Sequence, residues 1–421
     1  MVFTPFTVIA GANASGKSNL LDALQLLSDL SHNDLKNSFT KQRGEAIELF
    51  TQYGENDFAR EMTFEVDMLI DKSVKDAWGG AATLKYTRLC YRLVIVRRSN
   101  EKGIDELFVK DELLKPIRHK EDQWVEKQLP RGEVRYHWRP KVSGRRSKPY
   151  IHTELCNGVP TIKLPQDGRQ GGKETPGDAA TRTVLSGIDD VNFPHALAAR
   201  EEMKQWQFLQ LNPDDLRQPT KKQIGMSDII SQSGENLAAA LYRIHTEDEF
   251  ALKDISRRLN NIFSHLLEIQ VTDDRANNQY LITVVSEDRK TFSSRVLSEG
   301  TLRLIALCIF LFDNSHDGLL CYEEPENGIH PFRIKALAEL LKDLGVDFSQ
   351  TTMPLRQIIV NTHSSVLVGE IFKWRDDDQV LPVENAAAQH RVREKESCHH
   401  RHEARAKGRR SKATQVVFRI E

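Results

Sequence analysis

A glycine-bearing loop close to the start of the chain has the composition of a phosphate-binding loop. Residues 11–18 read Gly-Ala-Asn-Ala-Ser-Gly-Lys-Ser, which matches GxxxxGK followed by Ser or Thr. Glycines let such a loop wrap a chain of phosphates with its backbone N–H groups pointing inward. Lys17 can neutralise the β and γ phosphates, and the Ser18 hydroxyl can bind Mg²⁺. The residues expected to contact a nucleotide are Gly11, Asn13, Ser15, Gly16, Lys17, Ser18 and Asn19.

A pair of glutamates far downstream could supply the acids that hydrolysis needs. Residues 319–326 read Leu-Leu-Cys-Tyr-Glu-Glu-Pro-Glu, an apolar strand that ends in carboxylates. We expect Glu323 to serve the metal, through water, and Glu324 to act as general base for an attacking water. Acids after a strand are often simply solvated. The order of this motif after a phosphate-binding loop favours the catalytic interpretation.

Two further motifs could contact a γ-phosphate. Residues 297–301, Leu-Ser-Glu-Gly-Thr, open a helix whose N-terminus could bind phosphate through Ser298 and the backbone of Gly300. Taken alone, the motif is better explained by Ser298 as an ordinary N-cap. His363 follows a buried strand and could contact the γ-phosphate or order the attacking water. A lone histidine at such a position is more often a structural residue. The place of His363 in the series of motifs favours the functional interpretation.

The hydrophobic spacing predicts the elements that position these residues. The phosphate-binding loop lies between a strand and a helix, which disfavours a plain turn. Strands are expected at 3–10, 62–70, 83–96, 267–271, 280–285, 319–322 and 357–360, and helices at 19–30, 193–207, 236–245, 250–267, 301–312 and 331–344. The alternating segments 62–70 and 83–96 predict an antiparallel sheet beside the nucleotide site.

Composition indicates a globular protein with no obvious charge preference. The 421 residues are 39% hydrophobic and 28% charged, and the net charge is −1, so only local patches can indicate nucleic acid. No apolar run approaches the roughly 20 residues that cross a bilayer, and the first residues lack the features of a secretion signal. The five cysteines are scattered without a CxxC pair. These features favour a cytoplasmic location and no membrane partner.

Taken together, the motifs resemble those of ABC-type ATPase heads in the RecF, SMC and OLD group. Their order is Walker A, signature, Walker B, a D-loop at residues 327–331 and a switch histidine, over roughly residues 1–60 and 230–370. The resemblance implies an α/β P-loop NTPase fold, an ABC-type head with an antiparallel β subdomain and a mixed α/β insertion. It implies ATP and Mg²⁺ as cofactors.

In this group two heads dimerise head to tail around ATP. Carried over, Ser298 and Gly300 would act on the partner's nucleotide, and His363 on the chain's own. Gln52 is a weak candidate for the Q-loop and a metal contact, with a structural turn as the more probable alternative. Heads of this group usually begin with a strand or two before the strand that leads into the phosphate-binding loop. This chain starts only ten residues before Gly11, so we expect either a shortened sheet edge or a truncated start.

The sequence predicts four regions: residues 1–110 and 231–375 as the two parts of the head, 111–230 as an insertion, and 376–421 as a basic, disordered tail. The segment 166–181 reads as a flexible loop. Residues 115–148 combine basic residues with Trp124, Tyr136 and Trp138, which would suit nucleic acid. Buried aromatics in a solvated hairpin region are the slightly favoured alternative.

The resemblance implies an ATPase that dimerises as a homodimer or higher homo-oligomer and regulates a separate partner in antiphage defence or genome maintenance. Many relatives work beside a nuclease. The acids 376–378 lack the strand context of a nuclease motif, so a nuclease activity would come from a separate subunit. The alternatives are a RecF-like repair ATPase that binds DNA directly and a scaffold that binds ATP without turnover.

Overall fold

The central sheet of the protein consists of five parallel strands in the order β12-β17-β18-β1-β19. The computed structural model describes residues 1–12, 15–55, 57–142, 148–167, 171–223, 229–374 and 380–382. The strands are β1 (Phe6–Ala10), β12 (Gln207–Leu209), β17 (Gly318–Glu323), β18 (Arg356–Thr362) and β19 (Val380–Pro382). Because both faces are covered, nearly all residues of β17 and β18 are buried.

Two hydrophobic cores lie on the two faces of this sheet. Ile358 and Val360 of β18 belong to one core, whereas the intervening Ile359 belongs to the other. This alternation follows from the two-residue period of a strand. The first core contains the apolar faces of α9 (Glu299–Phe312) and α10 (Ile334–Leu344), and the second contains that of α1 (Lys17–Leu30).

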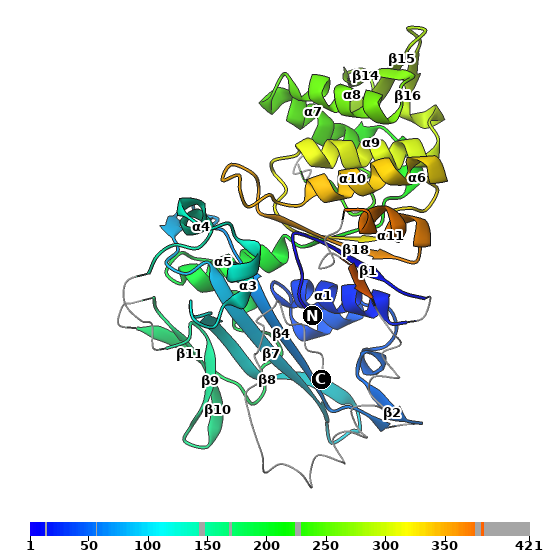
Figure 1. Cartoon of the computed structure of the whole chain (residues 1–421). Helices are drawn as coiled ribbons and strands as arrows, with labels where there is room; N and C mark the ends of the chain where they lie inside the picture. Colours follow the sequence, from blue (N-terminus) through cyan, green and yellow to red (C-terminus); the bar gives the residue numbers. More distant parts are fainter. Residues whose placement is uncertain are drawn as a thin grey trace.

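A helical layer with its own small sheet extends the first core, at the top of Figure 1. Its helices are α6 (Pro213–Arg217), α7 (Leu237–Glu247), α8 (Ala251–Ile262) and α11 (Ser365–Phe372). Its strands are β13 (Thr220–Lys221), β14 (Leu266–Asp274), β15 (Gln279–Ser286) and β16 (Thr291–Ser293), all antiparallel. The expected helix 250–267 ends at Ile262, because the following residues pair with β15 as a strand.

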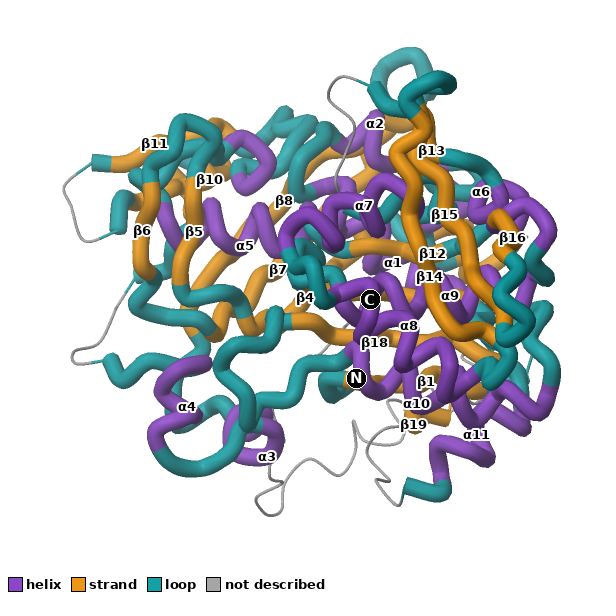
Figure 2. Tube along the Cα trace, turned by 90° about the horizontal axis from the view of Figure 1, so that it is seen from above, coloured by secondary structure: helices purple, strands orange, loops and turns teal. Residues whose placement is uncertain are grey.

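A three-stranded antiparallel sheet extends the second core. It is formed by β4 (Glu61–Leu69), β7 (Arg88–Ser99) and β8 (Asp105–Pro116), so the expected antiparallel sheet is confirmed. In β4 every second residue is buried, and these side chains pack in the same core as α1. Figure 2, seen from above, shows this sheet and α5 (Pro194–Lys204) on the opposite side of the molecule from β14 and β15.

Short elements connect the larger ones. They are α2 (Leu35–Thr40), β2 (Gln52–Gly54), β3 (Asp57–Phe58), β5 (Ser73–Lys75), β6 (Ala81–Thr83), α3 (Gln123–Gln128) and α4 (Glu133–Trp138), with 3-10 turns at Ala46–Leu49, Leu185–Gly187, Ser294–Val296 and Pro331–Arg333. None of the helices in the described part of the chain is long and apolar enough to cross a membrane.

The insertion contains a small sheet that the sequence only partly indicates. β9 (His152–Cys156), β10 (Val159–Pro165) and β11 (Gly172–Pro176) form two antiparallel pairs. The expectation of a flexible loop over 166–181 is therefore wrong at β11. All five residues of β11 are exposed, so the strand shows no alternation of buried apolar residues. It is defined by its backbone pairing with β10 alone.

The expected region boundaries stay predictions. β8 runs across residue 110, and β12, within the expected insertion, pairs with β17 of the central sheet. Residues 376–379 and 383–421 of the expected tail lie outside the described residues.

Candidate nucleotide site

The phosphate-binding loop joins β1 to α1, at the carboxyl end of the parallel sheet. Gly16 has φ 89°, a left-handed conformation that glycine adopts without strain, and α1 begins at the next residue. Lys17 is 7% exposed, and its Nζ donates to the carbonyls of Gly11 at 2.9 Å and Ala12 at 2.7 Å. The lysine is thus held within the loop, as the motif predicts. Asn13 lies outside the described residues.

Ser18 and Glu323, 305 positions apart in sequence, meet at the mouth of the sheet. The Ser18 hydroxyl donates to the Glu323 Oε1 at 2.5 Å. The Asn361 side-chain amide lies 3.1 Å from the same carboxylate oxygen and 3.4 Å from the Ser18 hydroxyl oxygen. This pairing is the expected one for a serine and an acid that share a magnesium ion.

Glu324 sits in a backbone conformation that non-glycine residues rarely adopt. Its φ is 47°, and its N–H donates to the Asn361 carbonyl at 2.8 Å. The carboxylate lies 3.0 Å from the His363 Nδ1 through one oxygen and accepts from the Asn327 amide at 2.8 Å through the other. Strained residues held by their surroundings cluster at functional sites. The side chain is 39% exposed, so water reaches it.

The ends of three adjacent strands therefore assemble the predicted residues. Lys17 and Ser18 follow β1, Glu323 and Glu324 end or follow β17, and His363 follows β18. A cavity of about 430 Å³ opens between the phosphate-binding loop and the loop from β18 to α11. Its lining residues are Ala10, Gly11, Ala12, Thr362, His363, Ser364, Ser365 and Val368.

The Ser298 motif lies apart from this cluster. Ser298 is exposed and caps α9 by accepting from the Thr301 N–H at 3.3 Å. A Cβ added to Gly300 would lie 2.6 Å from the Gly328 carbonyl oxygen, so the start of α9 packs directly on the D-loop. Within the described residues, no hydrogen bond joins Ser298 or Gly300 to Lys17.

Gln52 is not brought to the metal-side residues by any contact in the described part of the chain. It is exposed on β2, and its amide donates to the Gly54 carbonyl at 3.0 Å. This contact lies within the hairpin of Gln52 and fits the alternative of a structural turn. A role for Gln52 at a metal ion stays a prediction.

Three residues near Glu323 were not predicted. Asn361 stands at the end of β18, two residues before His363, and its position in the motif was the one available signal. The Arg43 guanidinium lies 3.8 Å from the Glu323 carboxylate. Burial raises the pKa of Asp22, an effect that Arg43 opposes and the charge of Glu323 reinforces. Nothing in the sequence near Arg43 or Asp22 indicates this proximity.

Residues 6–150 and 164–369 match the family described as "AAA domain, putative AbiEii toxin, Type IV TA system". This match spans well over half of the chain. The chain belongs to this family. The expectation of an α/β P-loop NTPase of ABC type is confirmed by the family and by the position of the phosphate loop between β1 and α1.

Heads of SMC proteins are among the solved structures that match the chain. An SMC head bound to the C-terminal winged-helix domain of ScpA is 17% identical, covers 87% of this chain and 85% of that one, and gives a TM-score of 0.40. The Thermotoga maritima SMC head is 12% identical, with 87% and 84% covered and a TM-score of 0.33. The Pyrococcus furiosus Smc head bound to the C-terminal domain of ScpA is 13% identical, with 94% of each chain covered and a TM-score of 0.36. No curated protein sequence matches the chain.

The aromatic residues of the basic segment 115–148 are largely buried. Trp124 and Trp138 pack around Phe348, and their indole N–H groups donate to the carbonyls of Phe3 and Phe348, each at 2.9 Å. Tyr136 is 41% exposed, with Lys141 over its ring. The alternative of buried aromatics is therefore confirmed for the two tryptophans, which are not available to stack on bases.

Proposed function

We propose that this AAA-family chain hydrolyses ATP with Mg²⁺ and that two copies dimerise around the nucleotide to regulate a partner. The observation that carries the proposal is the meeting of Ser18 with Glu323 beside the Glu324–His363 pair. A serine that can bind Mg²⁺ and an acid that can bind its water shell thus stand next to a carboxylate that can accept a proton.

The residues present fit a magnesium nucleotide. Among the described residues, Lys17 donates to the loop carbonyls of Gly11 and Ala12, and the Ser15 hydroxyl oxygen is buried without a hydrogen-bond partner. Within the same part of the chain, the Asn361 side-chain oxygen is also buried without a partner. Lys17 and the loop N–H groups would hold the phosphates, and Ser18 and Glu323 would hold the ion. Mg²⁺, when bound, neutralises charge on the β and γ phosphates.

Glu324 is placed to act as the general base. It is exposed enough to reach water, and its two oxygens are oriented by His363 and Asn327. By accepting a proton from a bound water, Glu324 would make that water a nucleophile toward the γ-phosphate. His363 lies at the cavity wall and is in reach of both the carboxylate and the space beside the phosphate-binding loop.

Two exposed apolar side chains support dimerisation through the face that carries Ser298 and the D-loop. Phe332 directly follows the D-loop and is 90% exposed, and Val296, two residues before Ser298, is 69% exposed. Contiguous apolar surface that faces solvent marks interaction sites, and we take Phe332 and Val296 as parts of one such surface. A second copy that covers this face would bring Ser298 and Gly300 to the partner's nucleotide.

The regulated partner is proposed from the family and the motif resemblance together. The family description names a toxin of a type IV toxin–antitoxin system, which supports a role in defence. The resemblance to the OLD-like group favours a separate nuclease subunit, with direct DNA binding as the alternative. Arg145 and Arg146, two basic residues of the segment 115–148, lie outside the described residues.

The test is the oligomeric state of Glu324→Gln measured by light scattering with and without ATP and Mg²⁺. The variant keeps the shape of the side chain but cannot accept the proton, so it should accumulate as an ATP-bound dimer. Glu287→Gln, an exposed residue of the turn after β15, is the control and should behave as wild type. If both variants and wild type dimerise alike and none releases phosphate, the chain is a scaffold and the proposal of hydrolysis is wrong.

A further inference from the structure

Helix α9 is hydrogen-bonded to the D-loop through an arginine. Arg303 lies in the second turn of α9, and its guanidinium donates to the backbone carbonyl of Asn327, the first residue of the D-loop. Hydrogen bonds with a charged donor are roughly twice as strong as neutral ones. The position of the Asn327 backbone therefore depends on α9.

Asn327 in turn orients the proposed general base. Its side-chain amide donates to one carboxylate oxygen of Glu324 at 2.8 Å, and its backbone N–H donates to the Glu324 carbonyl at 3.1 Å. Because Asn327 is exposed, hydrogen bonds rather than core packing hold its side chain in place. A single residue thus contacts Arg303 through its carbonyl and Glu324 through its amide.

A second contact joins α9 to the D-loop at Gly328. This glycine has φ 72°, and a Cβ added to it would lie 2.7 Å from the Arg303 Nη1 and 3.2 Å from a Glu299 carboxylate oxygen. The Gly328 carbonyl packs against Gly300, at the start of α9. Such close packing leaves little room for independent movement. The start of α9 and residues 327–328 therefore form one packed unit.

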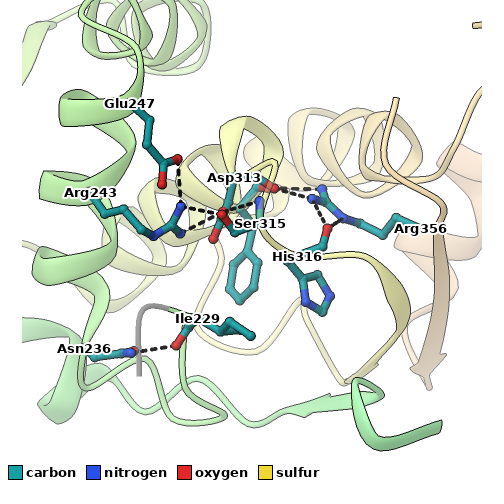
Figure 3. Close-up of polar contacts among 9 residues, drawn as sticks. Ile229, Asn236, Arg243, Glu247, Asp313, Ser315, His316 and Arg356 are labelled. Carbon is teal, nitrogen blue, oxygen red and sulfur yellow. Dashed lines mark hydrogen bonds and ion pairs between the residues drawn. The ribbon is translucent and has the colours of Figure 1, made fainter. Parts of the chain in front are cut away.

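The opposite end of α9 is fixed to the central sheet (Figure 3). Asp313 directly follows α9, and its carbonyl accepts from the Arg356 guanidinium at 2.6 Å, whereas its carboxylate accepts from that of Arg243 at 2.8 Å. Arg356 is 2% exposed and begins β18, and it also donates to the Phe310 carbonyl at 3.1 Å. Because charged hydrogen bonds hold this end, a force on α9 displaces its start more than its end.

We propose that Arg303 is a positioning residue that keeps Asn327 on the carboxylate of Glu324 in its own chain. The proposal rests on the function proposed above, because it takes Glu324 as the base. Arg303 belongs to the same helix as Ser298 and Gly300, which would meet the nucleotide of the second copy. Contact with that nucleotide at the start of α9 is relayed through Arg303 and Asn327 to the base of the other site. One helix thus serves both nucleotides of the dimer.

The experiment begins with phosphate release from ATP by Arg303→Met, in which methionine keeps an unbranched stem and removes the donors. The kcat should fall about tenfold or more, because misplacing a catalytic group by about 1 Å can cost roughly 100-fold. Arg303→Lys keeps a charged donor and should retain turnover within about threefold of wild type. Arg257→Met is the matched control, because Arg257 is an exposed arginine of α8, and its turnover should equal that of wild type.

The stability of the dimer separates this role from a general effect on α9. In the Glu324→Gln background, Arg303→Met should leave the dissociation constant of the ATP-bound dimer within about threefold, because Ser298 and Gly300 keep their places. A change that disordered the start of α9 would weaken the dimer as well. Light scattering at several protein concentrations, with ATP and Mg²⁺, gives this constant.

A double-mutant cycle tests the route through Asn327. Asn327→Ala removes the amide that contacts Glu324 and keeps the carbonyl that accepts from Arg303. If Arg303 acts through this amide, Arg303→Met should lower kcat less than about threefold in the Asn327→Ala background, against about tenfold or more in wild type. The two changes are then not additive, as expected for residues that act on the base by one route.

Three results would overturn the proposal. They are a kcat of Arg303→Met equal to that of wild type, an equal loss of kcat in the two backgrounds, and a dimer weakened about tenfold, which would assign Arg303 to the packing of α9. Absent turnover in wild type would overturn the proposed function and this proposal together. Wild-type turnover that Arg303→Met retains would overturn this proposal alone. Thermal unfolding of each variant is compared, and Arg303→Gln, whose shorter side chain lacks the guanidinium, replaces Arg303→Met if that variant is unfolded.

Discussion

At the scale of single residues, the site depends on contacts between side chains that are hundreds of positions apart. Lys17, Ser18, Glu323, Glu324 and His363 were all indicated by local motifs, and the structure brings them together. Asn361 and Arg43 were not predicted as site residues, because their roles arise from where β18 and the segment after α2 place them. A sequence motif identifies residues that are close in the chain and share a fixed local geometry. A contact between distant segments has no corresponding pattern in the sequence.

Asn361 provides a test of the metal-side residues. Its amide contacts Glu323 and Ser18, and it is 2% exposed. Residues that orient a metal ligand typically change metal affinity about 10–100-fold when removed. We expect Asn361→Ala to raise the Mg²⁺ concentration for half-maximal turnover by about that factor, measured by phosphate release. Asn260→Ala is the control, because Asn260 lies on α8 and is not one of the residues of the candidate nucleotide site. An unchanged Mg²⁺ dependence would exclude this role.

At the scale of elements, hydrophobic periodicity predicted the long helices and the buried strands. Strand β17 was expected at 319–322 and runs over Gly318–Glu323, and α9 ends at Phe312 as expected. Strand β11 was missed because all of its residues are exposed and only backbone pairing defines it. Strand β8 was not predicted either, and its first four residues are exposed or half-buried. Periodicity reports burial, so strands without a buried face are invisible to it.

The contact between α9 and the D-loop leads to a second prediction. A Cβ at residue 300 would lie 2.6 Å from the Gly328 carbonyl oxygen, which is backbone and cannot rotate away. We expect Gly300→Ala to destabilise the protein by about 1–3 kcal/mol, as overpacking does, and to reduce turnover by displacing Asn327 from Glu324. Thermal unfolding and phosphate release measure both effects. Gly369→Ala, in α11 with open space around it, should instead stabilise by up to about 1 kcal/mol. Equal stabilisation by both changes would contradict the packing account.

The junction of α5 with β17 leads to a third prediction, for the pH dependence of stability. Burial raises the pKa of Glu202 to about 8, and the nearby carboxylates of Asp317 and Asp71 add to the shift. The unfolded chain releases this proton near 4.5, whereas the folded chain retains it to about 8. The folded state therefore binds more protons between these values, and stability falls as pH rises from about 4.5 to 8.

The change in the free energy of unfolding from this one group should be on the order of 2–4 kcal/mol. Chemical unfolding at several pH values measures it. Glu202→Gln should reduce the change in the free energy of unfolding between pH 4.5 and 8. Glu287→Gln should not, because Glu287 is exposed. A slope that is the same in wild type and Glu202→Gln would show that another group is responsible.

At the scale of the whole molecule, the face around Phe332 is predicted to be an interface between copies. We expect Phe332→Ser, in a Glu324→Gln background, to weaken the ATP-bound dimer tenfold or more, since exposed aromatics at an interface often contribute more than 1 kcal/mol. Analytical ultracentrifugation with ATP gives the dissociation constant. Phe250→Ser is the matched control, because Phe250 is 57% exposed and directly precedes α8. This change should leave the dissociation constant unchanged. Equal weakening by both would argue against an interface at the D-loop.

The most direct test of the central claim is phosphate release from ATP by wild type and Lys17→Ala, with and without Mg²⁺ and duplex DNA. The account predicts Mg²⁺-dependent turnover in wild type that falls by about 100-fold or more when the lysine is removed. Stimulation by DNA would favour direct DNA engagement, and its absence would favour a separate partner. Turnover that is equal in the two proteins, or absent in both, would contradict the assignment of Lys17 and the neighbouring acids to ATP hydrolysis.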